Sequence, residues 1–139
     1  MKVLKFGGTS VANATNIKLV LQIIGQENKS NRLAVIVSAL SGVTDLLLSA
    51  SKKAALKDSD YKIIFEEIKN KHTQAIEELI DKNNQTEIFE AINNNLNQLK
   101  TLLDGCFLLG ELSPRTNDAV AGFGELLSSQ IIAKALSQN

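Results

Sequence analysis

The sequence predicts an α/β fold with parallel strands, because two short apolar runs flank one amphipathic helix. The first run covers residues 2–6, and the second, Leu33–Val37, is continuously apolar and rich in β-branched side chains. Apolar residues between them repeat at the spacing of one helix face: Ile17, Val20, Leu21 and Ile24. This order forms a βαβ unit with a right-handed crossover. The second run is typical of a strand that helices cover on both faces.

The remaining chain is predicted to be helical, which leaves two strands against five or six helices. Residues 59–104 are expected to form an antiparallel helical hairpin, since two apolar stripes lie on either side of the polar residues 83–85. Its role is open between a lid, a dimer surface and a packing layer. His72 lies within the first stripe and is expected to be a packed side chain rather than a catalytic one. Because a two-stranded parallel sheet is rarely complete, we expect a piece of a larger protein.

The end of the chain is predicted to hold one more helix. Gly105 and Gly110 are expected to bound a short apolar piece, and Ser113 followed by Pro114 marks a helix start. The helix is expected to run over residues 115–136.

A glycine pair interrupts this last helical segment. Gly122 and Gly124 are expected to bend the helix or to let a ligand approach its backbone. Glu125 follows the break directly.

Composition narrows the class of protein. The 139 residues suffice for one domain with a core. Fifteen basic and fifteen acidic side chains cancel, so no net field favours nucleic acid or an acidic membrane. Cys106 is the only cysteine, which excludes an internal disulfide and favours a cytoplasmic location. The apolar stretches are too short for a membrane span or a signal-peptide core.

The first strand leads into a loop suited to an anion. The segment Lys5-Phe6-Gly7-Gly8-Thr9-Ser10 places a lysine before two glycines and two hydroxyl residues. Glycines allow a tight turn, and the N–H groups of such a turn, beside the positive end of a following helix, can bind phosphate. The segment matches neither the Walker pattern nor the dinucleotide fingerprint. The competing interpretation is a plain strand-to-helix turn with a solvated lysine.

The second strand leads into a similar loop, Ser38-Ala39-Leu40-Ser41-Gly42-Val43-Thr44-Asp45. In open α/β sheets, ligands bind in the crevice beyond the carboxyl ends of the strands. Two loops of this composition at neighbouring strand ends therefore predict a shared binding site.

Three segments in this order resemble one family: Lys5–Ser10, Ser38–Thr44 and Gly124–Ser128. Together they are similar to the amino-terminal part of aspartate kinases, within the amino acid kinase family. Residues 11–14 and 103–110 are similar to the bifunctional aspartokinase–homoserine dehydrogenases. The resemblance implies a three-layer α/β/α, carbamate-kinase-like fold. Residues 1–139 would then be the incomplete amino-terminal part of its catalytic domain, with the rest of that domain and any regulatory or dehydrogenase domain absent.

The family implies transfer of the γ-phosphoryl group of ATP, with Mg²⁺, to the side-chain carboxylate of L-aspartate. The product, 4-phospho-L-aspartate, leads toward lysine, threonine, methionine and isoleucine. The implied partners are L-aspartate, ATP and further copies of the chain as a homo-oligomer, with no nucleic acid and no membrane. In the family, the nucleotide-base loop and an arginine for the substrate carboxylate lie beyond residue 139, so we expect little or no turnover from this chain alone.

The resemblance also assigns roles to the loop after the first strand. Lys5 would hold the transferring phosphoryl group as the catalytic residue. Gly7, Gly8, Thr9 and Ser10 would complete the ATP-binding loop.

The other motif residues would bind the amino-acid substrate. Ser38 and Thr44 would contact aspartate, and Glu125 would pair with its α-ammonium group. No metal-ligating residue is assigned. Asp45 stands where the family often has asparagine, so its charge either faces solvent or weakens aspartate binding. The simpler alternatives are a helix-capping Thr44 and a solvated Glu125.

Two other functions remain open. One is a different amino acid kinase, acting on glutamate, acetylglutamate or a nucleotide. The other is a non-catalytic binding or assembly module, in which the hairpin is an oligomer interface and the loops are only turns.

Overall fold

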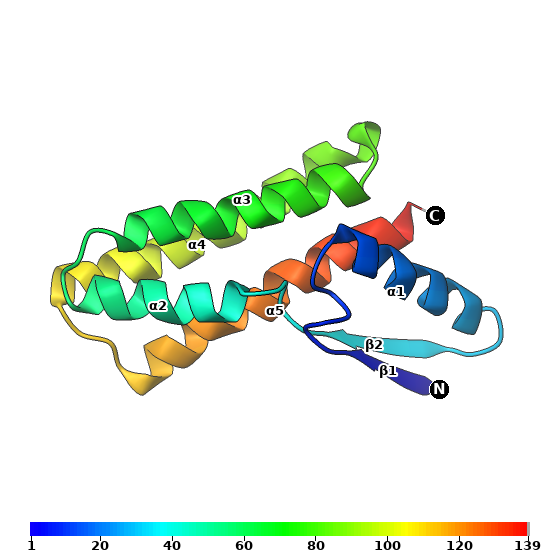
Figure 1. The fold of residues 1–139 in the computed structure, drawn as a ribbon, viewed down its shortest axis with the longest axis horizontal. Coiled ribbons are helices and arrows are strands. Elements are labelled where there is room, and N and C mark those ends of the chain that lie inside the picture. Colours follow the sequence, from blue (N-terminus) through cyan, green and yellow to red (C-terminus); the bar gives the residue numbers. More distant parts are fainter. Residues whose placement is uncertain (139) are drawn as a thin grey trace.

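The computed structural model describes residues 1–138 and has two parts that one long helix joins (Figure 1). One part is a two-stranded sheet beside α1, and the other is a bundle of α2, α3 and α4; α5 runs through both. The elements are β1 (Lys2–Phe6), α1 (Ala14–Glu27), β2 (Leu33–Val37), α2 (Val43–Ala55), α3 (Tyr61–Leu79), a 3₁₀ turn (Lys82–Asn84), α4 (Gln85–Leu109) and α5 (Pro114–Ser137).

The sheet confirms the predicted βαβ unit. β1 and β2 pair in parallel, with Lys2 opposite Leu33 and Phe6 opposite Val37. α1 connects them and buries one apolar stripe, which consists of Ala14, Ile17, Val20 and Ile24.

The prediction that both faces of β2 are covered is wrong for these residues. Phe6 and Val37 pack against the core on one face. On the other face Val3 is 57% exposed and Ile36 is 52% exposed. Within residues 1–138, all helices that contact the sheet lie on the Phe6 side, and Lys5 shares the open face because side chains alternate along a strand.

The hairpin stripes are buried inside the bundle, as the periodicity predicted. Ile68 and Ile76 of α3 and Leu99 and Leu103 of α4 are fully buried. Both helices pack on α2 and α5. The two stripes therefore serve to pack the bundle, while a role of the hairpin's outer faces as a lid or dimer surface stays a prediction.

Two expected helix interruptions are absent from the described residues. α4 runs through Gly105 and ends at Gly110, whose φ of +67° closes the helix in the left-handed conformation. Burial of Leu103 and Cys106 on either side outweighs the cost of roughly 1 kcal/mol for one glycine in a helix. α5 is likewise continuous through Gly122 and Gly124, so the predicted break is also wrong.

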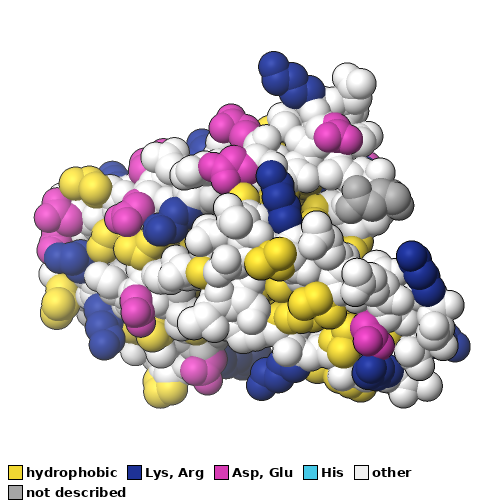
Figure 2. All heavy atoms as spheres, turned by 45° about the vertical axis from the view of Figure 1, so that its right-hand side comes forward, with side chains coloured by type: hydrophobic (Ala, Val, Ile, Leu, Met, Phe, Trp, Pro, Cys, Tyr) yellow, Lys and Arg dark blue, Asp and Glu magenta, His cyan; other side chains and the backbone are white. Residues whose placement is uncertain are grey.

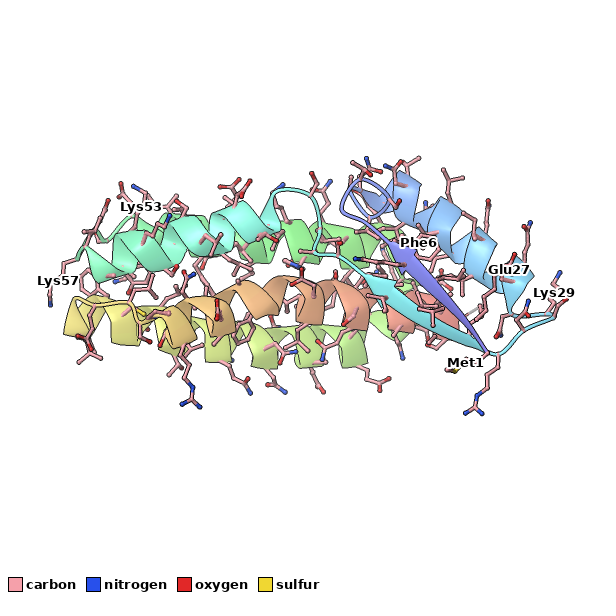
Figure 3. All side chains as sticks on the ribbon, turned by 90° about the horizontal axis from the view of Figure 1, so that it is seen from below. Met1, Phe6, Glu27, Lys29, Lys53 and Lys57 are labelled. Carbon is pink, nitrogen blue, oxygen red and sulfur yellow. The ribbon has the colours of Figure 1, made fainter. Side chains whose placement is uncertain are left out.

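One group of polar contacts between the bundle helices lies at the far end of the bundle, away from the sheet. Lys57 donates from Nζ to the carbonyl oxygen of Leu108 at 3.0 Å, and Figure 3 shows Lys57 at the opposite end of the molecule from Met1 and Lys29. Nearby, Tyr61 donates from its hydroxyl to Asp104 Oδ1 at 2.7 Å. Burial and this hydrogen bond raise the pKa of Tyr61 to about 12.

Acidic and basic side chains interleave on the surface, with apolar side chains between them, on the face that Figure 2 shows. This distribution agrees with the balanced composition. Within residues 1–138, no helix is both long enough and apolar enough to cross a membrane.

His72 is a packed side chain, as expected. It is fully buried in α3, where Nδ1 donates to the carbonyl oxygen of Ile68 at 2.6 Å. Its Nε2 has no hydrogen-bond partner among residues 1–138. Because a proton on Nε2 would be a buried donor without an acceptor, burial lowers the pKa of His72 below its usual value of 6.5.

This buried imidazole predicts a pH-dependent stability. Below pH 6.5 the unfolded chain takes up a proton that the folded chain excludes, so the free energy of unfolding falls with falling pH. The expected slope approaches about 1.4 kcal/mol per pH unit until the folded pKa is reached, and it vanishes above about pH 7. Urea unfolding at several pH values between about 7.5 and 5 measures this slope. His72 is the only histidine, so a His72→Leu variant that keeps the slope would contradict the assignment.

Candidate functional site

An open cleft of about 720 Å³ lies beyond the carboxyl ends of both strands. Three stretches of the chain form it: the loop after β1 with the start of α1, the loop after β2 with the start of α2, and one turn of α5. Its lining residues are Gly8, Thr9, Ala12, Asn16, Ser38, Ala39, Leu40, Ser41, Gly42, Thr44, Asp45 and Glu125. This is the place where a parallel sheet is expected to bind a ligand.

The loop after β1 forms one wall of the cleft. It turns at Gly7, whose carbonyl oxygen accepts from the N–H groups of Ser10 at 3.0 Å and Val11 at 3.3 Å. Neither Gly7 nor Gly8 has a positive φ, and a Cβ at either would meet no atom within 4 Å. The backbone conformation therefore does not require these glycines, but their small size leaves the loop open to a ligand.

Asn16 anchors this loop, and sequence reasoning missed it. Its Nδ2 donates to the carbonyl oxygen of Thr9 at 2.9 Å, while its own N–H donates to Asn13 Oδ1 at 2.9 Å. Asn13 is the N-cap of α1. The sequence signal for the cap was Asn13, a favoured N-cap residue before the apolar repeat of the helix, but no local signal indicates the contact of the Asn16 side chain with Thr9.

The loop after β2 forms the opposite wall and presents a helix N-terminus. Gly42 adopts a φ of +77° as the N-cap of α2, which favours glycine, and no side chain caps this helix. The free N–H groups of the first turn give this end of α2 a positive potential. Thr44 and Asp45 are exposed in that turn and line the cleft.

α5 supplies the third part of the wall. Glu125 is exposed on the cleft side, and the preceding Gly124 is buried against the loop after β2. A Cβ at Gly124 would lie 2.8 Å from Ala39 Cβ and 3.7 Å from Thr44 Oγ1. The contact that the glycine permits is thus with the protein's own loop, and it brings Glu125 next to Thr44.

The structure brings together five of the eight predicted site residues: Gly8, Thr9, Ser38, Thr44 and Glu125. Gly7 and Ser10 belong to the same loop but do not line the cleft. Lys5 is exposed on the open face of the sheet, two residues before Gly7, and no carboxylate within residues 1–138 pairs with it. Its side chain can therefore move toward the strand end.

The side chains of the cleft suit a small zwitterion better than a metal. The hydroxyl groups of Ser38 and Thr44 line the same cleft as the carboxylate of Glu125, and Asp45 adds a second carboxylate. Within residues 1–138, no group of three His, Cys, Asp or Glu side chains is placed to bind a metal ion. Mg²⁺ commonly binds through one or two carboxylates together with nucleotide phosphates, and Asp45 and Glu125 fit that mode only with a bound triphosphate.

Comparisons with known proteins identify the family. The model of the amino acid kinase family matches residues 1–139. A chloroplastic bifunctional aspartokinase/homoserine dehydrogenase of Arabidopsis thaliana is 34% identical over 93% of this chain. An aspartokinase of Candida albicans is 32% identical over 89% of this chain. The chain spans 14% and 24% of the length of these two relatives.

Solved structures give the same result. The structure of Escherichia coli aspartokinase III in complex with aspartate and ADP matches with a TM-score of 0.84 and 28% identity, over 98% of this chain and 28% of that one. The complex of the same enzyme with lysine and aspartate also has a TM-score of 0.84, at 27% identity. The two strands and their helices are thus part of an amino acid kinase fold, and the chain belongs to the amino acid kinase family, in which it corresponds to the amino-terminal region of aspartokinases.

Proposed function

We propose that this chain supplies the aspartate-binding part of an aspartate kinase, which transfers the γ-phosphoryl group of ATP to the side-chain carboxylate of L-aspartate. The observation that carries the proposal is the cleft itself. It joins the glycine loop after β1, the hydroxyl groups after β2 and Glu125 of α5 in one space. Two solved structures of a relative in complex with aspartate have the same fold over 98% of this chain.

Each group has a chemical task in this reaction. The α-ammonium group of aspartate pairs with Glu125, and the hydroxyl groups of Ser38 and Thr44 orient the anionic part of the substrate without adding charge. The open end of α2 adds N–H donors beside Thr44. Asp45 lies on the same wall, so its charge is expected to weaken binding of the substrate carboxylates relative to an asparagine.

Phosphoryl transfer needs positioning and charge neutralisation more than covalent help. A carboxylate oxygen of aspartate attacks the γ-phosphorus, the new O–P bond forms, and the bond to the leaving oxygen of ADP breaks. No general base is needed, because the carboxylate is already ionised. Lys5 and the N–H groups of Gly7 and Gly8 reduce the repulsion between the two anions, with Thr9 and Ser10 completing the loop. Bound Mg²⁺ would neutralise further phosphate charge.

For the parts of the enzyme outside this chain, the proposal relies on the resemblance to the family. Residues 1–139 would form the amino-terminal part of the catalytic domain, with the hairpin of α3 and α4 as its helical layer. The loop for the nucleotide base and the arginine for the substrate carboxylate would lie outside this chain, which alone would show little or no turnover. Homo-oligomer formation, cytoplasmic location and a following homoserine dehydrogenase domain stay predictions.

The alternatives are less well supported. An assembly module is one alternative, but the two apolar stripes that suggested an interface on the hairpin are buried against α2 and α5. A kinase for glutamate or acetylglutamate is a closer competitor, because it would use a similar glycine loop.

An assay of the complete gene product separates these possibilities. It should release ADP from Mg·ATP with L-aspartate, and hydroxylamine should trap the acyl phosphate as aspartyl hydroxamate. Phosphorylation of glutamate or acetylglutamate without aspartate would overturn the proposal, and so would the absence of any aspartate-dependent ADP release.

Glu125 provides the residue-level test. Glu125→Gln keeps the shape of the side chain and removes its charge, so we expect the KM for aspartate to rise about tenfold, the equivalent of roughly 1.4 kcal/mol. The KM for ATP should stay within twofold. Asp118→Asn, which removes an exposed carboxylate two turns earlier on α5, is the matched control and should change neither value. An unchanged KM for aspartate in Glu125→Gln would remove this residue from the site.

A further inference from the structure

Ser128 is a buried hydroxyl group with no role in the function described so far. It lies on α5, one turn after Glu125, and has no solvent exposure. Its Oγ donates to the carbonyl oxygen of Ser38 at 2.7 Å, across 90 residues of sequence. The same Oγ lies 3.3 Å from the carbonyl oxygen of Glu125. One hydroxyl group thus contacts the backbone of two residues that line the cleft, Ser38 of the loop after β2 and Glu125 of α5.

Hydrogen bonds fix the backbone of Ser38 through both its N–H group and its carbonyl group. Its N–H donates to the carbonyl oxygen of Phe6 in β1 at 3.1 Å, and its carbonyl oxygen accepts from Ser128. β2 has ended at Val37, so no strand partner is available for this carbonyl group. The Ser128 hydroxyl group therefore replaces the missing ladder partner and attaches the end of the sheet to α5.

The same turn of α5 carries a second close contact with this loop. Gly124 is buried against Ala39, the neighbour of Ser38. Gly124 sets how near α5 can approach, and Ser128 sets where along the helix the loop is attached. Glu125 lies between these two contacts in sequence.

We propose that Ser128 is a positioning residue that fixes the separation between Ser38 and Glu125, and thereby the length of the amino acid that the cleft accepts. The proposal rests on the proposed function, in which Ser38 and Glu125 bind opposite ends of aspartate. A cleft of fixed length favours aspartate over glutamate, which is one methylene longer. Without the hydroxyl group, α5 and the loop can separate, and this discrimination weakens.

The test uses Ser128→Ala in the complete gene product. We expect the KM for aspartate to rise five- to tenfold, with kcat and the KM for ATP within twofold. The ratio of kcat/KM for aspartate to that for glutamate should fall by at least the same factor. Ser128→Cys keeps the branching of the side chain with a slightly larger atom and a weak donor, so its values should lie between those of the wild type and Ser128→Ala.

Two serine variants serve as matched controls. Ser51 is equally buried and donates only within its own helix, to Leu48, so Ser51→Ala reports the loss of a buried hydroxyl group alone. Ser129 is the exposed neighbour of Ser128 and donates only to Leu126. Both variants should keep the aspartate KM and the selectivity of the wild type. If Ser51→Ala changed the aspartate KM and the selectivity as much as Ser128→Ala does, the effect of Ser128→Ala would reflect a loss of stability, and the positioning role would be overturned.

The outcomes separate this inference from the proposed function. A wild-type protein without aspartate-dependent turnover overturns the proposed function. An active wild type with an unchanged Ser128→Ala variant overturns the positioning role. A ¹⁵N spectrum of the 139-residue chain tests the contact without activity: Ser128→Ala should shift the amide signals of Ser38 and Ala39, and Ser129→Ala should not. Unshifted signals would exclude the contact itself.

Discussion

Lys5→Ala in the complete gene product is expected to lower the rate of aspartate-dependent ADP release by about 10²–10³, the equivalent of ~3–4 kcal/mol. The physical reason is charge. As the γ-phosphoryl group moves between two anions, an ammonium group at the strand end stabilises the transition state more than the ground state. Because binding of the substrates changes less, the loss should appear mainly in kcat.

The position of Lys5 makes this a demanding test. The side chain lies on the open face of the sheet and does not line the cleft, although its backbone is three residues from Gly8. Lys5→Met keeps much of the length of the side chain and removes the charge, so it should lose nearly as much activity as Lys5→Ala. If either variant retains activity within a few-fold of the wild type, Lys5 does not hold the phosphoryl group.

Lys2 supplies the matched control on the same strand. Its Nζ pairs with Glu27 Oε2 at 2.7 Å, and both side chains are partly exposed to solvent. Exposed ion pairs of this kind contribute less than about 1 kcal/mol to stability. Lys2→Ala should therefore keep the activity of the wild type, so that a large loss in Lys5→Ala cannot be attributed to the removal of any cation from β1.

The elements of this chain were predictable because they depend on local periodicity. The apolar repeat of α1 and the two stripes of α3 and α4 specify helices whatever surrounds them. The position of the cleft was predictable as well, since parallel strands bring their carboxyl ends to one edge of the sheet. That rule indicates the loop Ser38–Asp45, whereas the choice of Ser38 and Thr44 within it came from the family resemblance.

Features that depend on contacts between distant segments could not be predicted in this way. Periodicity alone does not place Glu125 beside Thr44, and only the family resemblance indicated that Glu125 belongs to the site. The hydroxyl group of Ser128 lies 90 residues from its acceptor. Similarly, the exposure of Ile36 depends on which elements cover the sheet rather than on its apolar sequence.

The glycines show most clearly that contacts between distant segments could not be predicted from the sequence. A glycine in the sequence indicates either a backbone conformation or a close contact, and the sequence does not distinguish the two. Gly7 and Gly8 were expected to provide the conformational freedom of a tight turn, yet in the two cleft loops the glycine with a positive φ is Gly42. Gly124 was expected to interrupt a helix, yet it lies in a continuous helix against Ala39.

This contrast leads to the second large expected effect, that of Gly124→Ala. The new Cβ would lie 2.8 Å from Ala39 Cβ and 3.5 Å from Leu47 Cδ1. Ala39 is itself buried between the loop and α5, so α5 and the loop must move apart. Overpacking of this kind costs about 1–3 kcal/mol, and the gain of helix propensity from glycine to alanine offsets only up to about 1 kcal/mol of it.

Gly122→Ala separates the gain in helix propensity from the cost of overpacking, because it adds the same methyl group to the same helix two residues earlier. Gly122 is exposed, and a Cβ there would meet no atom within 4 Å. Gly122→Ala should therefore raise the free energy of unfolding by roughly 0.5–1 kcal/mol, while Gly124→Ala lowers it by about 1–2 kcal/mol. Thermal unfolding of the 139-residue chain should show the two variants shifted in opposite directions, with midpoints about 5–10 °C apart. Since the displaced turn carries Glu125, Gly124→Ala in the complete gene product should also raise the KM for aspartate. If both variants stabilise the chain equally, α5 does not contact the loop after β2, and Glu125 has no fixed position beside Thr44.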